Sequence, residues 1–145
     1  MTLFRLLYAS VARPGMDYDQ LTDILRLAVD RNAERGLTGV LCYSGGIFVQ
    51  ALEGDRAVVN RLYNSIAHDP RHGECQILDA SSITTRDFAE WSMKLIGWDD
   101  VPTASRRALL LRHSGSTAFD PRQMSGPQAI GFLRDLADSE RRAAA

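Results

Sequence analysis

Alternating apolar and polar positions predict five β-strands in this chain. Their expected ranges are 2–10, 37–43, 47–53, 75–81 and 91–96. In the first strand, Tyr8 and Ser10 fall on the same face as the apolar residues. In the third, Gln50 falls between Phe48 and Leu52 on one face. Both strands therefore carry polar side chains on a face that their pattern assigns to the core.

Apolar residues at helical spacing predict two helices between these strands, over 17–35 and 56–68. Asp17 or Asp19 can cap the first helix, and Gly36 ends it. Pro70 ends the second, because proline cannot continue a helix. A further helical turn is expected over residues 84–89.

The predicted order, β-α-β-β-α-β followed by one more strand, is that of a ferredoxin-like α+β fold. In this fold two helices lie on one face of the sheet, so the other face needs a cover. Two further helices are expected after Pro102, the first over 103–112. The second begins at a capping box formed by Ser125 and Gln128. This helical extension could cover the bare face of the sheet or form an oligomer contact.

Composition supports a division into residues 1–98, the sheet domain, and 99–145, the helical extension. Residues 1–100 hold 10 basic and 14 acidic side chains, whereas residues 101–145 hold 7 and 4. The total charge of −1 gives no general attraction to nucleic acid or to an anionic membrane. Because no apolar run is long enough to cross a bilayer and no leader pattern is visible, we expect a cytoplasmic protein.

Three polar side chains occupy positions that the pattern assigns to the interior: Tyr8, Gln50 and Asn32, which lies on the apolar arc of the first helix. Each alone has a structural interpretation, as a core tyrosine, a strand amide or a helix-capping residue. Together they favour a shared site, because a buried polar group without a partner costs about 1–3 kcal/mol. A planar ligand edged with carbonyls and ring nitrogens would satisfy all three.

Ordered motifs containing these residues resemble the BLUF family, flavin-holding sensors of blue light, over residues 2–97. The motifs are Leu6-x-Tyr8-x-Ser10, Arg31-Asn32, Thr38-Gly39-Val40-Leu41, Phe48-x-Gln50-x-Leu52-Glu53-Gly54, Asp69-x-Arg71-His72 and Phe88-x-x-Trp91-x-Met93. Any one of them is weakly specific, but the ordered set is highly specific. The remaining tail is similar to the helical extension of short members without an effector domain.

The resemblance implies FAD held between the two helices. Ile24 and Ile66 would sandwich the ring, and Asn32 would bind its carbonyl edge. Gln50 would lie between Tyr8 and the flavin. The remaining cofactor-binding residues that the resemblance implies are Phe48, Arg31, Asp69, Arg71 and His72.

The family mechanism involves no catalytic turnover. Excited flavin would draw an electron and then a proton from Tyr8, and Gln50 would rotate or tautomerise. Trp91, Met93 and Ser10 would relay the change, with Ser10 holding the tryptophan or nearby backbone. Which of Trp91 and Met93 faces the flavin is open. Because no effector motif follows residue 97, we expect a signal to a separate partner protein, and the leucine-rich tail favours a homo-oligomer.

Two other classes of function fit the fold. A small acylphosphate hydrolase would use Arg71 or Arg31 to bind phosphate and Asn32 to place water, but would leave Tyr8 and Gln50 unexplained. A regulatory module binding a metabolite between subunits is the third interpretation. We expect no metal site, because Pro70 separates His68 from His72 and prevents their alignment on one helix.

Overall fold

The computed structural model describes residues 1–98 and 103–144, and within them the strands form one mixed sheet. The strands are β1 Leu3–Ala12, β2 Thr38–Ser44, β3 Ile47–Asp55, β4 His72–Ser82 and β5 Lys94–Gly97. Their order across the sheet is β4-β1-β3-β2-β5. The first four strands pair antiparallel, and β5 runs parallel to β2 at the edge. This arrangement confirms the ferredoxin-like fold with one additional strand.

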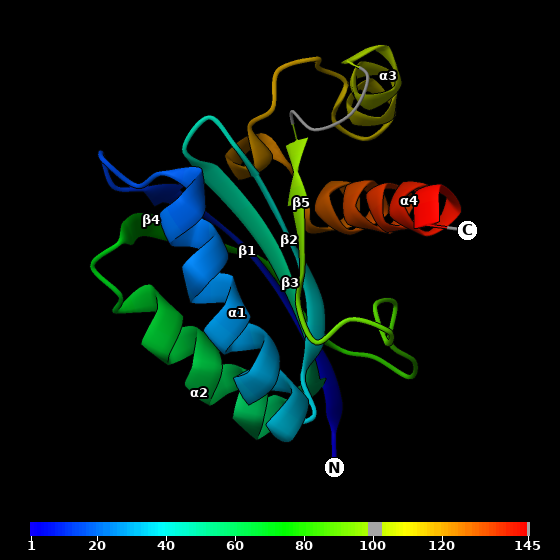
Figure 1. Ribbon diagram of the computed structural model, residues 1–145. Helices are drawn as coiled ribbons and strands as arrows, with labels where there is room; N and C mark the ends of the chain where they lie inside the picture. The colour runs from blue at the N-terminus through cyan, green and yellow to red at the C-terminus, as the bar shows by residue number, and fades with distance from the viewer. Residues whose placement is uncertain (99–102, 145) are drawn as a thin grey trace.

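One face of the sheet is covered by α1 Tyr18–Glu34 and α2 Arg56–Ala67, which lie side by side (Figure 1). Leu21 and Leu25 of α1 and Val59 of α2 pack on Leu6 and Leu52 of the sheet. Of the two expected caps, Asp17 is the one that begins α1. It forms a capping box, since Asp17 accepts the backbone N–H of Gln20 and the Gln20 side chain accepts the backbone N–H of Asp17. Gly36 takes a left-handed φ of 68° just after the helix, which glycine adopts without strain.

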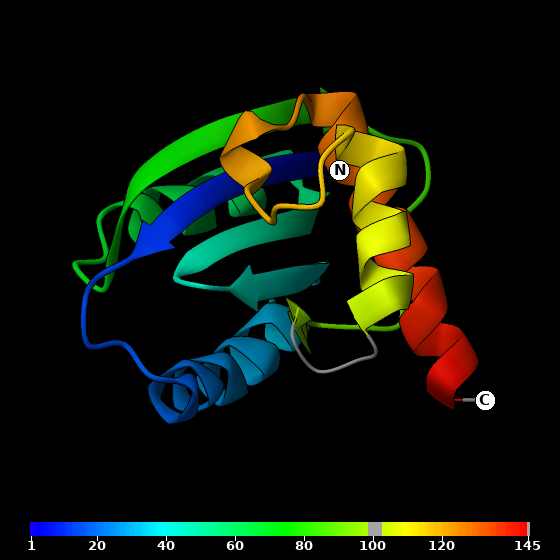
Figure 2. The same cartoon turned by 90° about the horizontal axis from the view of Figure 1, so that it is seen from above.

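The opposite face is covered by the C-terminal helices, and chiefly by α4 Gly126–Ala144 (Figure 2). Leu133 and Leu136 of α4 are fully buried against sheet residues that include Leu7 and Val49. The capping box before α4 forms as expected, with Ser125 accepting the Gln128 N–H at 3.2 Å. Helix α3, Thr103–Ser114, packs on α4. A short helix η2, Pro121–Gln123, lies between α3 and α4 in the chain. Of the two roles expected for the tail, covering the sheet is therefore the one seen within this single chain.

The prediction of a helical turn over residues 84–89 is wrong. The segment is a loop with a turn at Ala89–Glu90. Its backbone N–H groups at Asp87 and Phe88 donate to the buried carboxylate of Glu53, at 2.6 and 3.0 Å. These donors are therefore taken by a side chain distant in sequence rather than by helical carbonyls.

Two other expectations about element limits need correction. The fifth strand begins at Lys94 instead of Trp91, and β4 begins at His72 instead of Cys75. The boundary expected around residues 98–102 falls, beyond Trp98, outside the described residues.

Candidate functional site

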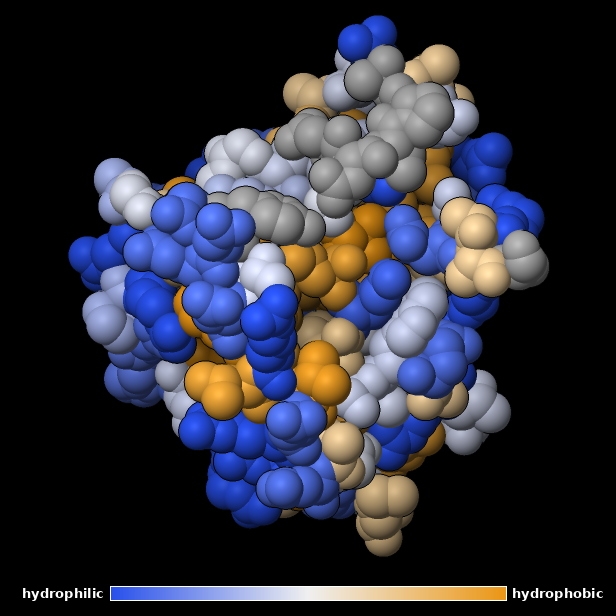
Figure 3. Space-filling view, in the orientation of Figure 1, coloured by the Kyte–Doolittle hydropathy of each residue, from blue (hydrophilic) through white to orange (hydrophobic). Residues whose placement is uncertain are grey.

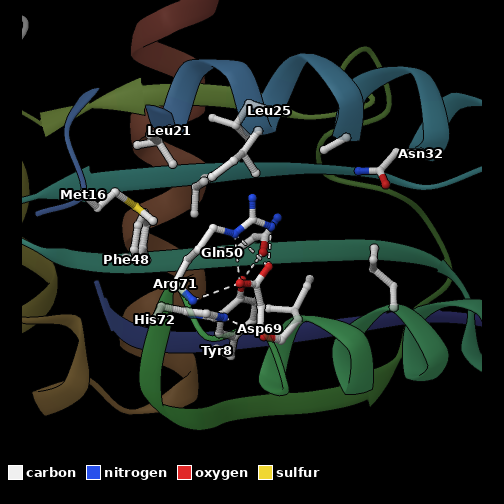
Figure 4. A pocket seen from close by; sticks show the side chains of 15 residues that line it. Tyr8, Met16, Leu21, Leu25, Asn32, Phe48, Gln50, Asp69, Arg71 and His72 are labelled. Atoms are coloured by element: carbon white, nitrogen blue, oxygen red, sulfur yellow. Dashed lines mark hydrogen bonds and ion pairs between the residues drawn. The ribbon is translucent and has the colours of Figure 1, made fainter. Parts of the chain in front are cut away.

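The two helices on the first face enclose a cleft above the sheet (Figure 4). Its walls come from α1 and α2, its floor from β1, β2 and β3, and one end from the segment that joins α2 to β4. The lining residues are Tyr8, Met16, Leu21, Ile24, Leu25, Ala28, Asn32, Leu41, Phe48, Gln50, Leu62, Ile66, Asp69, Arg71 and His72. Within the described residues, the cleft is thus apolar on its walls and polar at its floor and one end.

Tyr8 and Gln50 lie directly opposite each other on neighbouring strands of the floor. The Tyr8 hydroxyl donates a hydrogen bond to Oε1 of Gln50, and both side chains are buried. Burial raises the pKa of Tyr8 far above its usual range. The phenol therefore stays protonated and acts as the donor of this pair.

The other end of the Gln50 amide points at Met93, whose Sδ lies 3.4 Å from Nε2. Gly39 makes room for this contact: a Cβ there would lie 2.0 Å from the Ala51 carbonyl oxygen and 3.0 Å from Cε of Met93. Trp91 packs instead with the cluster on the α4 face. In this structure Met93 therefore contacts Gln50, whereas Trp91 lies on the α4 face of the sheet.

Asn32 lines the end of the cleft opposite Phe48 (Figure 4). It is only 3% exposed, which fits its expected place on the apolar arc of α1. Its Nδ2 donates to the backbone carbonyl of Ser92 at 3.0 Å. The amide is thus held in position by the segment that leads to Met93.

An ion pair between Asp69 and Arg71 lies at the mouth of the cleft. Nε of Arg71 is 2.9 Å from Oδ1 of Asp69, and Nη2 bonds to Oδ2. The guanidinium holds the pKa of the Asp69 carboxyl below its usual range, chiefly through these side-chain hydrogen bonds. A fixed fork of cationic donors therefore borders the apolar interior.

His72 is held at both ring nitrogens. Nε2 lies 2.6 Å from the Ile66 carbonyl oxygen, which can only accept, so Nε2 carries a proton. Nδ1 lies 2.8 Å from Oγ of Ser10, which is fully buried. In the neutral ring Nδ1 therefore accepts from the Ser10 hydroxyl. Ser10 was expected to hold Trp91 or nearby backbone. Its hydroxyl bonds to His72 in this structure, whereas Trp91 packs on the α4 face of the sheet.

The structure brings nine expected cofactor-binding residues to this one cleft: Tyr8, Ile24, Asn32, Phe48, Gln50, Ile66, Asp69, Arg71 and His72. Arg31 is exposed on α1 and is not among the lining residues, so its role stays a prediction. Sequence reasoning did not assign Met16, Leu41 or Leu62 to the site. The apolar arcs of the helices were the available signal for Leu62, whereas Met16 precedes α1 in a turn.

The donors and acceptors present fit a flat ring with a polar edge. Ile24 and Ile66 supply apolar contact from the two helices, and Gln50 and Asn32 supply amides that can donate or accept. In residues 1–98 and 103–144, no three His, Cys, Asp or Glu side chains are placed to hold a metal ion. None of the helices described is both long and apolar enough to span a membrane.

Comparison with known sequences agrees with this site. Residues 3–94 match the BLUF family model, described as "Sensors of blue-light using FAD". The photoactivated adenylate cyclase subunit beta of Euglena longa is 40% identical over 93 residues, which are 63% of this chain and 11% of that protein. The blue light- and temperature-regulated antirepressor BluF of Escherichia coli is 31% identical over 93 residues, 64% of this chain and 23% of that one. The chain thus spans about a tenth of the length of the cyclase subunit and about a quarter of BluF.

Solved structures match over almost the whole chain. BlsA in its photo-activated state superposes with a TM-score of 0.81 at 32% identity, covering 92% of this chain and 94% of that one. BlrB, a BLUF protein in its dark state, gives a TM-score of 0.77 at 32% identity, covering 96% and 97%. These matches extend beyond the sheet domain into the C-terminal helices. From the family match, the fold and the cleft together, this chain belongs to the BLUF family of blue-light sensors.

Proposed function

We propose that this chain senses blue light through FAD bound in the cleft between α1 and α2, and that the signal begins with a rearrangement of Gln50. The single observation that carries this proposal is the buried hydrogen bond from Tyr8 to Gln50 at the floor of the cleft. When bound, the flavin supplies absorption of blue light and a transient electron acceptor.

Each group of lining residues has a separate part in holding the cofactor. Ile24 and Ile66 would contact the ring, and Asn32 would bind its carbonyl edge. Arg71, fixed by Asp69, lies at the mouth of the cleft and would hold the part of the cofactor that reaches it. We also propose that Arg31 helps to bind the cofactor. Its exposed side chain would have to turn toward the mouth of the cleft to do so.

Gln50 suits the role of a switch because its amide has two different ends. In this structure, Oε1 accepts from Tyr8 and Nε2 points at the Met93 sulfur. Rotation of the amide places its NH2 group against Tyr8, so the hydroxyl must accept instead of donate. A hydrogen bond contributes about 1 kcal/mol net, which is within the usual range of couplings between sites.

The signal is proposed to pass to a separate partner protein, and the chain to form a homo-oligomer in the cytoplasm. Figure 3 shows apolar side chains gathered at the surface beside β5. Leu27 and Val29 of α1 are exposed. Leu111 of α3 is exposed as well. Such surfaces support a protein contact. The E. coli relative is named an antirepressor, which supports signalling by protein association.

The acylphosphate hydrolase alternative has no support in the site. The Arg71 guanidinium is engaged by Asp69, and the hydrolase hypothesis gives no role to the Tyr8–Gln50 pair. The metabolite-binding alternative needs a site between subunits, whereas this cleft lies within one chain.

Titration of the purified chain with FAD, followed by absorption spectroscopy in darkness and in blue light, tests the proposal. We expect saturable FAD binding and a flavin band that moves to longer wavelength in light and returns in darkness. Absence of FAD binding, or a bound flavin whose band does not move, would contradict it. Hydrolysis of an acylphosphate by a colourless protein would favour the alternative.

A further inference from the structure

The loop between β4 and β5, residues 83–93, separates the cleft from α4 and is held from both sides. On the cleft side, three consecutive residues are fixed by three different elements. The Trp91 carbonyl accepts the Gly39 N–H of β2 at 3.0 Å, and the Ser92 carbonyl accepts from Asn32 of α1 at 3.0 Å. Met93 contacts Gln50 of β3. A change at Gln50 therefore acts on a segment that includes Trp91.

On the opposite side, Arg141 of α4 makes several contacts with the same loop. Nη2 of Arg141 donates to the Asp87 carbonyl and to Oε1 of Glu90, both at 2.6 Å. Nε donates to Oε2 of Glu90 at 3.2 Å. The guanidinium carbon lies 5.0 Å from the centre of the Trp91 ring, within range of a cation–π contact. Asp138, one turn earlier on α4, orients the side chain through Nη1 at 2.7 Å.

Resting on the proposed function above, we propose that Arg141 is a positioning residue of the photosite. It holds Trp91 on the α4 face while Met93 contacts Gln50, and it makes α4 the element that responds when Gln50 rearranges. Arginine suits this role because one planar guanidinium stacks on the indole and binds the Glu90 carboxylate as a fork, which lysine cannot do. Arg141 lies outside residues 3–94, the segment that the family model matches.

Coupling between two sites is reciprocal, so the contact on α4 must affect the photosite. Thermal recovery in darkness has to return Trp91 to its position beside Arg141. Removal of Arg141 destabilises that position. We expect the Arg141→Ala chain to recover from its light form about fivefold more slowly than wild type. This factor corresponds to the free energy of one lost cation–π contact.

Arg134→Ala is the matched control. Arg134 also lies on α4 and pairs with Asp87 at 3.1 Å. The cation that lies over the Trp91 ring is that of Arg141. We expect its recovery to stay within about twofold of wild type, because cation–π stabilisation is specific to the ring contact. Should Arg141→Ala not fold, Arg141→Gln, which removes the charge, replaces it under the same criterion.

A double-mutant cycle identifies the ring as the partner. In a Trp91→Leu background, Arg141→Ala should change the recovery rate little. Unchanged recovery in Arg141→Ala, equal slowing in Arg134→Ala, or full persistence of the Arg141 effect without Trp91 would each overturn this inference. If wild-type protein itself shows no light-induced shift, the proposed function fails instead.

Discussion

The buried carboxylate of Glu53 accepts the backbone N–H of Phe88 at 3.0 Å, joining β3 to the β4–β5 loop. The same carboxylate accepts from Asp87 N–H and from the Thr38 hydroxyl, at 2.6 and 2.9 Å. Glu53 and Gln50 thus lie on one strand and fix the two ends of the segment from Asp87 to Met93. The loop is therefore held in place beside Gln50.

Replacement of Glu53 by Ala should strongly destabilise the fold. Three donors lose their acceptor at a buried position, and we expect the free energy of unfolding to fall by about 3 kcal/mol. Urea unfolding of the purified chain measures this loss. Glu34→Ala, at an exposed position on α1, should change the stability by less than about 0.5 kcal/mol. Similar effects of the two substitutions would refute the structural role of Glu53.

Several features of the fold could be predicted from local sequence. Asp17 at the start of α1 and Ser125 before α4 are recognisable because a capping interaction joins residues only three apart. The cleft-facing positions of Tyr8, Asn32 and Gln50 follow from period two in the strands and period 3.6 in the helix.

Other features depend on contacts between distant residues and leave no local signal. The loop over 84–89 replaces the expected helical turn because Glu53 takes its N–H groups. The pairing of Ser10 with His72 arises where β1 and β4 meet at an irregularity in their register. The outward position of Trp91 depends on α4, which follows it by more than thirty residues.

Tyr8→Phe should retain the cofactor and lose the light response. The substitution removes the hydroxyl that donates to Gln50 but keeps the ring that packs in the core. The light-minus-dark absorption difference at constant FAD occupancy checks this expectation. Tyr43→Phe is the control. The Tyr43 ring is tilted against Phe48, with ring centroids 4.8 Å apart, and Tyr43 is outside the residues that line the cleft. A normal light response in Tyr8→Phe would show that the phenol is not required.

Gly39→Ala should displace Met93 or the neighbouring strand. Its new Cβ would lie far inside contact distance of the Ala51 carbonyl oxygen, at 2.0 Å, and close to the Met93 methyl group. We expect a loss of about 2–3 kcal/mol in stability, typical of overpacking. Gly73→Ala on β4 is the matched control, because a Cβ there meets nothing within 4 Å. Thermal unfolding compares the pair, and equal stability of the two variants would contradict the crowding at Gly39.

The Asp69–Arg71 pair predicts a dependence of stability on pH. Because Arg71 lowers the folded-state pKa of Asp69 below its usual 3.8, the pair's stabilisation is present above that value and lost as the pH falls through the folded-state pKa. The pair lies at the surface, so the effect is about 0.5 kcal/mol. Wild type should exceed Asp69→Asn in unfolding free energy near neutral pH, and the difference should vanish in acid. A difference that grows on acidification would have the wrong sign.

The role of Gln50 as the switch is tested most directly by the light-minus-dark absorption difference of the Gln50→Leu chain loaded with FAD. Leucine fills much of the space of the amide but can neither accept from Tyr8 nor exchange a donor for an acceptor. We expect Gln50→Leu to bind FAD and to show no shift of the flavin band in blue light. A reversible shift of wild-type size in this variant would contradict the claim that Gln50 is the switch.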